Sequence, residues 1–265
     1  MTTSDYTLLD RPEVSATLFH PRREAAQAID GPGHSIDIPV ADDHTIGARW
    51  HMGSDTGANI LFFHGNGEIV ADYDELGPLY NSLGINLLAV DYRGYGRSSG
   101  SPSVSAMMAD CHRILAFCED WLPRHNYTGP LILMGRSLGS ASVLELAAIY
   151  PQRIQGLIIE SGFAYAAPLL RLLGLDPDRI GFKEEKGFAN LAKIRKYTGP
   201  TLIIHAEFDH IIPYSDSEAL FAASPAEQKK HLKIPGANHN DIFLRGMAPY
   251  LEAVQAFCRD LLKSS

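Results

Sequence analysis

Residues 131–150 read LILMGRSLGSASVLELAAIY, and this stretch joins a short apolar run to a helix-forming segment through a glycine-rich turn. The continuous run Leu131–Met134 predicts a strand covered on both faces, as in a parallel sheet. The Ala- and Leu-rich segment Ser140–Tyr150 predicts a helix. The turn between them matches G-x-S-x-G, a pattern in which a strained bend lifts a serine hydroxyl above the sheet. We therefore expect an α/β fold that presents Ser137 at the carboxyl end of a central strand.

The same alternation of apolar runs and helical patterns extends to both sides of this stretch. Two alternating stretches, His34–Val40 and Thr45–Met52, predict an antiparallel hairpin at the start of the sheet. Further strands are expected at Ile60–Phe63, Asn86–Val90, Leu157–Ile159, Leu202–Ile204 and His231–Ile234, and helices at about 72–83, 104–121, 138–150, 215–223 and 244–262. Because strands that alternate with helices imply parallel crossovers, the pattern predicts an eight-stranded, mostly parallel sheet with helices on both faces.

Two segments depart from this alternation. Residues 1–33 are mixed and polar, and we interpret them as an N-terminal extension before a single domain over residues 34–265. The long connection at about 161–199 predicts a small helical cap inserted over the binding pocket. Its aromatic residues Phe163 and Tyr165 are candidates for substrate binding, although core packing explains the same residues nearly as well.

Composition excludes several classes of protein. The chain has 265 residues, of which 45% are hydrophobic, and 23 basic residues stand against 31 acidic ones, so a nucleic-acid partner is not expected. No run of about 18 apolar residues occurs and the N-terminus lacks the features of a secretory signal, so no integral membrane segment is expected. Three cysteines make a poor disulfide framework, which favours a cytoplasmic location.

A second match to G-x-S-x-G occurs at residues 96–100, GRSSG, and serves as an internal control. Ser98 lies several residues beyond its strand and is followed by Ser101-Pro102, which indicates a loop and a helix start. Ser137, in contrast, has a strand directly before it and a helix directly after it. The context therefore selects Ser137 as the nucleophile and makes Ser98 a loop residue.

A serine hydroxyl needs a base to remove its proton, and the base needs an orienting acid. In enzymes with this turn both follow the serine in the chain. Among the downstream histidines, His239 lies in a flexible turn before the last helix and is the candidate base. Asp209, just after the strand Leu202–Ile204, is the candidate acid, with Glu160 as its rival. Asp241 is too close to His239 along the chain to orient its ring easily.

With these segments in order, the chain resembles the α/β-hydrolase superfamily over roughly residues 34–262, and most of all the small esterases of the Bem46, ABHD13 and ABHD17 type. The resemblance rests on the three segments above and on two more, residues 62–68 (FFHGNGE) and 91–98 (DYRGYGRS). It implies a Ser137, Asp209 and His239 triad and no cofactor or metal. It also implies an oxyanion hole made by the amide of Leu138 and by one from the 64–67 loop, with Asn66 the first choice and Gly67 the second.

The expected function is therefore hydrolysis of a carboxylic ester through an acyl-enzyme, with a small-molecule, hydrophobic acyl substrate. The same triad also serves thioesterases, peptidases and carbon–carbon bond hydrolases, since fold and triad do not fix the substrate. A ligand-binding receptor on the same scaffold is the alternative outside enzymes. The cysteine-rich, lipid-modified N-terminus of the ABHD17-like enzymes has no counterpart in residues 1–33, which makes depalmitoylation of membrane proteins doubtful.

Overall fold

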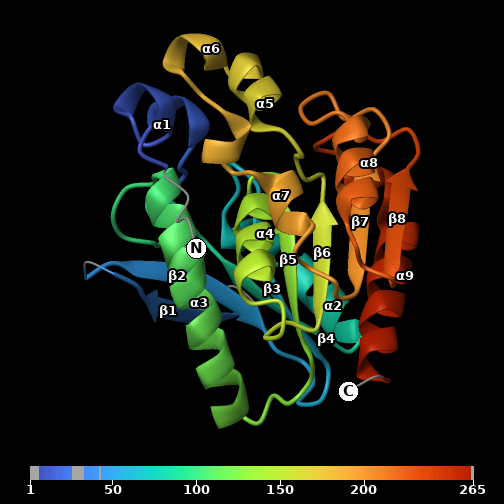
Figure 1. The fold of residues 1–265 in the computed structure, drawn as a ribbon. Helices are drawn as coiled ribbons and strands as arrows, with labels where there is room; N and C mark the ends of the chain where they lie inside the picture. Colours follow the sequence, from blue (N-terminus) through green and yellow to red (C-terminus); the bar gives the residue numbers. More distant parts are fainter. Residues whose placement is uncertain (1–5, 26–32, 42, 264–265) are drawn as a thin grey trace.

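The computed structural model describes residues 6–25, 33–41 and 43–263, and its centre is an eight-stranded sheet (Figure 1). The strands lie in the order β1-β2-β4-β3-β5-β6-β7-β8. Their bounds are β1 His34–Pro39, β2 Thr45–His51, β3 Ala58–Phe63, β4 Ile85–Val90, β5 Leu131–Arg136, β6 Gly156–Glu160, β7 Thr201–Ala206 and β8 Lys229–Ile234. Strands β1, β2 and β4 pair antiparallel, and all other pairs are parallel. The predicted fold class, including the opening hairpin, is confirmed.

The order of the strands decides where a site can form. Strand β3 lies between β4 and β5, so the chain reverses its direction of travel across the sheet at this point. In open parallel sheets ligands bind outside the carboxyl ends of the strands at such a reversal. The loops after β3, β5, β6, β7 and β8 therefore meet at one edge of the sheet.

Helices cover both faces of the sheet, and the sheet separates two hydrophobic cores. Helices α3 (Val104–Arg124) and α4 (Gly139–Ile149) contribute to one core, whereas α2 (Leu76–Ser82) and α9 (Ile242–Leu262) contribute to the other. Helix α8 (Tyr214–Ala223) packs against β7. Strands β3 to β7 are almost wholly buried, as their continuous apolar runs predict. Strand β2, whose sequence alternates, is buried at every residue except Thr45.

The helix expected at about 72–83 is divided into two pieces. A 3-10 turn, η2, covers Val70–Tyr73, and α2 begins only at Leu76. Pro78 lies in the first turn of α2, where a missing amide costs nothing. A helix that continued back through residue 74 would place the proline ring against the carbonyl of Asp74, so the break follows from Pro78.

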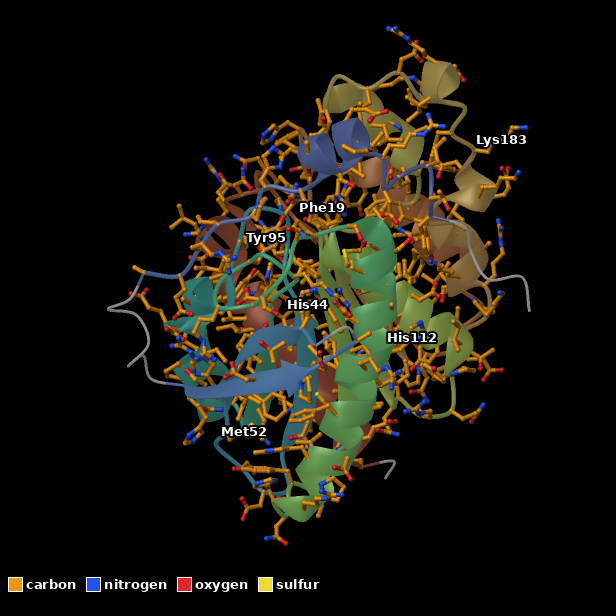
Figure 2. All side chains as sticks on the ribbon, turned by 90° about the vertical axis from the view of Figure 1, so that its left-hand side faces the viewer. Phe19, His44, Met52, Tyr95, His112 and Lys183 are labelled. Carbon is orange, nitrogen blue, oxygen red and sulfur yellow. The ribbon has the colours of Figure 1, made fainter. Side chains whose placement is uncertain are left out.

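The described part of the N-terminal segment packs on the main core. Helix α1 (Pro12–Leu18) buries Val14 and Leu18, and Phe19 is also buried. In the side view of Figure 2, Phe19 lies close to Tyr95, whose hydroxyl accepts a hydrogen bond from the amide of His20 (2.9 Å). Residues 1–5 and 26–32 of the expected extension lie outside the described residues. The boundary between an extension and a domain stays a prediction.

Between β6 and β7 the chain forms a group of short helices. Their bounds are α5 Ala166–Leu172, α6 Pro177–Ile180, η3 Glu184–Lys186 and α7 Asn190–Ile194. Helices α5 and α6 lie beyond the carboxyl ends of the strands, beside α1, whereas α7 packs against α4 (Figure 1). The charged stretch around Lys183 projects outward (Figure 2). None of the helices in the described part of the chain combines the length and hydropathy needed to cross a bilayer.

Candidate active site

Ser137 stands on a sharp turn between β5 and α4. Its φ is +50°, a left-handed conformation that costs a residue other than glycine roughly 1–3 kcal/mol. Both flanking glycines are required by close backbone approach: a Cβ on Gly139 would lie 2.0 Å from the carbonyl oxygen of Phe63, and one on Gly135 would lie 2.4 Å from that of Gly139. The amide of Ser137 donates to the backbone oxygen of Glu160 (2.9 Å), which fixes the turn to the neighbouring strand.

Three side chains from three loops form a continuous hydrogen-bonded chain. His239 Nε2 lies 3.1 Å from Ser137 Oγ, and His239 Nδ1 lies 2.7 Å from Asp209 Oδ2. A carboxylate only accepts hydrogen bonds, so the ring proton belongs to Nδ1 and Nε2 is left to accept from the serine hydroxyl. All three side chains are buried, which strengthens the hydrogen bonds between them.

Asp209 is held as a carboxylate. Its Oδ1 accepts hydrogen bonds from the amides of Ile211 (3.0 Å) and Ile212 (2.8 Å). Burial opposes its charge, but the hydrogen bond from His239 and the two amides outweigh burial and lower the pKa of Asp209. The structure therefore brings Asp209, with its charge, to the side of His239 that faces away from Ser137.

Glu160, the alternative candidate for the acid, lies near the site, but its carboxylate binds residues other than His239. Its Oε1 forms an ion pair with Arg136 Nε (3.1 Å), and its Oε2 accepts from the hydroxyl of Tyr250 (2.6 Å). Burial raises the pKa of Glu160 even though Arg136 and Tyr250 act against that rise. It is a buried hydrogen-bonding residue next to the site, and Asp209 holds the imidazole.

The control serine and the histidine of the 64–67 loop have structural contacts. Ser98 is fully buried, and its Oγ accepts from the amide of Gly47 (2.9 Å). His64 bonds through Nδ1 to the oxygen of Gly65 (2.8 Å) and through Nε2 to Asp91 (3.1 Å). Neither the His64 ring nor the Ser98 hydroxyl takes part in the hydrogen bonds that connect Ser137, His239 and Asp209.

The candidate oxyanion donors lie on two sides of Ser137. The amide of Leu138 is at the start of α4, where helices leave amides without backbone acceptors. The side chain of Asn66 is fixed by the carbonyl of Leu18 (2.7 Å) and the hydroxyl of Tyr95 (2.7 Å). Asn66 and Leu138 line the cavity at Ser137, whereas Gly67, whose φ is +78°, does not. Asn66 is thus better placed than Gly67.

An apolar cavity of about 100 Å³ opens at Ser137. The side chains around it come from the N-terminal segment, the loop after β3, the serine turn, the cap and the loop after β7. They are Leu18, Asn66, Ser137, Leu138, Phe163, Ala166, Leu169, Leu170, Leu172, Leu173, Phe188 and Ile211. Phe163 is therefore in the cavity wall, but Tyr165 is not. The Tyr165 side chain is 42% exposed, while the backbone amides of Ala164 and Tyr165 donate to the carboxylate of Asp216.

Two features of the site are not visible in the sequence patterns. Leu18 belongs to a segment that is polar on average, and only Val14, four residues earlier in the chain, signals with it a buried helix face. Arg136 occupies a variable position of G-x-S-x-G, where no pattern assigns a residue type.

Among the described residues, no group of three or more His, Cys, Asp or Glu side chains is arranged to hold a metal ion.

Comparison with known sequences gives related proteins over most of the chain. Residues 54–175 match the family described as serine aminopeptidase, S33. An uncharacterized protein of Mycobacterium tuberculosis is 29% identical over 247 residues, which are 88% of this chain and 82% of that protein. The human alpha/beta hydrolase domain-containing protein 17B is 32% identical over 214 residues, 75% of this chain but only 65% of the human protein.

Solved structures share the fold. Est1E from Butyrivibrio proteoclasticus, with ferulic acid bound, has a TM-score of 0.71 at 22% identity and covers 86% of this chain and 99% of its own. The esterase Pf2001 of Pyrococcus furiosus has a TM-score of 0.72 at 15% identity and covers 92% of this chain and 98% of its own. With the sheet order, the serine turn and these relatives in agreement, this chain belongs to the α/β-hydrolase superfamily.

Proposed function

We propose that this chain is a serine hydrolase that cleaves carboxylic esters of small or medium hydrophobic acyl groups through an acyl-enzyme. The observation that carries the proposal is the connection from Asp209 through His239 to Ser137, with distances of 2.7 and 3.1 Å, at the mouth of an apolar cavity. A pure binding protein needs no such connection, because binding does not require an activated hydroxyl.

The reaction begins when Ser137 Oγ attacks the ester carbonyl carbon and His239 Nε2 takes the hydroxyl proton. Asp209 stabilises the imidazolium, and the amides of Leu138 and Asn66 donate to the oxyanion, each contributing about 3–4 kcal/mol. The carbon–oxygen bond to the leaving alcohol then breaks as His239 returns its proton to that oxygen. Water repeats the sequence on the acyl-enzyme, releasing the acid and restoring Ser137.

The wall of the cavity favours esters over peptides. An aminopeptidase must bind the charged amino group of its substrate, which calls for a carboxylate near the nucleophile. None of the described residues that line the cavity is charged. The solved relatives named as esterases support the same choice. The name of the matching family, serine aminopeptidase, keeps amide hydrolysis as the second candidate.

A panel of substrates tests the proposal. Rates on p-nitrophenyl esters of increasing acyl length should exceed those on acyl-thioesters and aminoacyl amides, with an optimum at small or medium chains. A fluorophosphonate probe should label Ser137, because only an activated serine reacts with it. Absence of labelling in the folded protein would favour a binding protein, and a preference for aminoacyl amides would favour a peptidase.

The cytoplasmic location suggested by the cysteines stays a prediction.

A further inference from the structure

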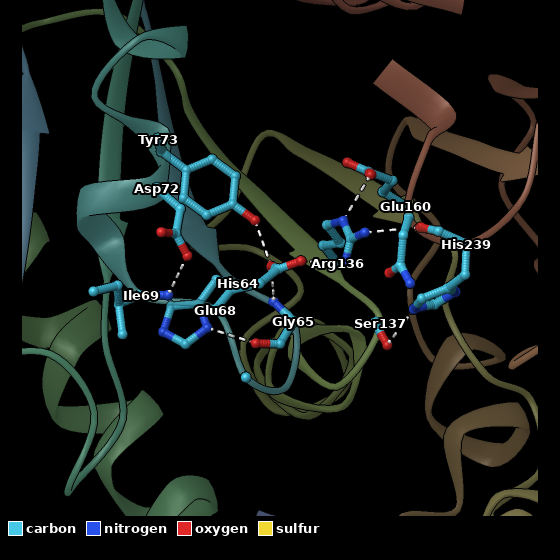
Figure 3. Close-up of polar contacts among 12 residues, drawn as sticks. His64, Gly65, Glu68, Ile69, Asp72, Tyr73, Arg136, Ser137, Glu160 and His239 are labelled. Carbon is cyan, nitrogen blue, oxygen red and sulfur yellow. Dashed lines mark hydrogen bonds and ion pairs between the residues drawn. The ribbon is translucent and has the colours of Figure 1, made fainter. Parts of the chain in front are cut away.

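We propose that Arg136 is a positioning residue that holds three parts of the active site in one arrangement: the oxyanion loop (residues 64–68), the serine turn (residues 135–139) and the histidine loop (residues 235–241). This inference rests on the proposed function and deepens it. Figure 3 shows the Arg136 guanidinium between Glu68 and Glu160, with a further contact toward His239.

The first contact reaches the histidine loop. Arg136 donates through one terminal nitrogen to the backbone oxygen of His239 (2.8 Å). The bond is made to the residue whose ring must meet Ser137 Oγ at 3.1 Å. Because Arg136 directly precedes Ser137 in the chain, this bond joins the base to the neighbour of the nucleophile.

The second contact reaches the oxyanion loop. The other terminal nitrogen of Arg136 pairs with Glu68 Oε1 (2.5 Å). Glu68 Oε2 in turn accepts from the amide of Gly65 (2.7 Å) and from the hydroxyl of Tyr73 (2.5 Å). Gly65 directly precedes Asn66, the candidate oxyanion donor, so the position of that amide depends on the Arg136–Glu68 pair.

The third contact secures the serine turn itself. Arg136 Nε pairs with Glu160 Oε1 (3.1 Å), while the backbone oxygen of the same glutamate accepts from the amide of Ser137 (2.9 Å). One residue, Glu160, thus binds Arg136 through its side chain and Ser137 through its backbone. The planar guanidinium supplies the fixed directions that three separate acceptors require.

The oxyanion loop is shaped around this guanidinium. A Cβ on Gly65 would lie 2.7 Å from the Nη1 atom of Arg136 and 2.9 Å from Glu68 Oε2. Glycine at residue 65 is therefore explained by the approach of Arg136. Gly65 of the HGNG segment and the arginine of G-x-S-x-G therefore belong to one arrangement.

The charges of the cluster are consistent with a buried, ionised arginine. Burial opposes the charge of Arg136, but Glu68 and Glu160 raise its pKa above the usual range. Burial also opposes the charge of Glu68, yet Arg136 and Tyr73 lower the pKa of Glu68. A buried ion pair adds little net stability compared with apolar packing. Its benefit here is the fixed geometry of the three loops.

The test replaces Arg136 by lysine, which keeps the charge but cannot bridge three acceptors in fixed directions. Arg93→Lys is the matched control: Arg93 is also buried and makes a two-pronged contact with Asp110 (2.7 and 2.9 Å), a residue of α3 that belongs to none of the three loops. We expect Arg136→Lys to lower kcat on a p-nitrophenyl ester about 10- to 100-fold with little change in KM, since small displacements of reacting groups have effects of this size. Arg93→Lys should retain kcat at equal folded fraction.

A second variant keeps the test decisive if Arg136→Lys does not fold. Glu68→Gln preserves the size of the side chain and removes the charge that holds the oxyanion loop to Arg136. It should lower kcat while KM stays nearly constant, and it should slow fluorophosphonate labelling of Ser137 in parallel. Wild-type kcat in both folded variants would overturn the inference, as would a change confined to KM. Absence of both turnover and labelling in the wild-type protein would instead overturn the proposed function itself.

Discussion

Ser137 has a strained backbone conformation that the surrounding backbone contacts hold in place. Its left-handed φ is held in place by the hydrogen bond from its amide to the backbone oxygen of Glu160 and by glycines that let α4 approach β3 closely. The strain lifts the hydroxyl out of the sheet toward His239, so the chemistry depends on the conformation of one residue. Ser98, which matches the same pattern, lacks this setting because its hydroxyl accepts from a backbone amide in the core.

Asp209→Asn tests the acid at the residue scale. An amide at residue 209 favours the wrong tautomer of His239 and cannot stabilise the imidazolium, so kcat should fall by roughly 10⁴ with little change in KM. Steady-state kinetics on a p-nitrophenyl ester measure both constants.

The matched control is Asp241→Asn. Asp241 lies two residues from His239, but its carboxylate binds Asn238 and Arg245 instead of the ring. We expect this variant to keep kcat within a few fold. A larger loss of kcat in Asp241→Asn than in Asp209→Asn would contradict this assignment and indicate that Asp241 orients the His239 ring.

At the scale of elements, the sheet brings together loops that are distant in sequence. The residues of the site follow β3, β5, β7 and β8, which lie close to one another in the strand order. Helix α5 and the N-terminal segment then close the cavity from above with Leu170 and Leu18. The sheet supplies the reacting groups, and the covering elements supply the apolar wall.

Leu170→Ala tests the cap as part of the substrate pocket. Leu170 is almost wholly buried and lines the cavity, so its truncation enlarges the space above Ser137. We expect the optimum of a p-nitrophenyl acyl series to move to chains longer by about two carbon atoms. The free energy of unfolding should fall by about 2–5 kcal/mol.

Leu115→Ala is the control for this prediction. Leu115 is equally buried but belongs to α3 and does not line the cavity. It should lose similar stability without any change in acyl preference. An unchanged optimum in Leu170→Ala would mean that α5 does not contact the acyl group.

Sequence periodicity placed the eight strands and the long helices, because continuous apolar runs and helical spacing are local properties of the chain, but it did not divide the helix expected at about 72–83 into η2 and α2. The sequence also selected Ser137, Asp209 and His239, through the serine motif, its context and the order of the downstream loops, and the structure brings these three residues together. It could not place Leu18, because the packing of α1 over the site depends on contacts between distant segments. Nor could it separate Phe163 from Tyr165, since only the path of the backbone turns one inward and the other outward.

At the scale of the whole molecule, the described residues form two hydrophobic cores, and the three cysteines are divided between them. Cys111 and Cys118 lie in the core under α3, and Cys258 lies in the core under α9. All three are free thiols and buried. Their titration therefore reports the opening of the two cores.

The buried thiols contribute to the alkaline pH dependence of stability. Burial raises the pKa of Cys258 from 9.0 to about 12. Above about pH 9 the unfolded chain loses this proton while the folded protein keeps it, so the thiol's contribution to stability is lost as pH rises toward 12. The free energy of unfolding of the wild-type protein should fall, relative to Cys258→Ala, by up to about 1.4 kcal/mol per pH unit in that window. Denaturant titrations of both proteins between pH 8 and 11 measure the difference, and parallel curves would contradict the burial of this thiol.

Hydrolysis of a p-nitrophenyl ester by Ser137→Ala, compared with Ser98→Ala and the wild-type protein, tests the central claim most directly. The account predicts that Ser137→Ala lowers kcat/KM by several orders of magnitude, about 10⁴-fold or more. Ser98→Ala should retain turnover per folded molecule, because its hydroxyl is a structural acceptor for Gly47. Equal activity of folded Ser137→Ala and wild-type protein would contradict the assignment of Ser137 as the nucleophile.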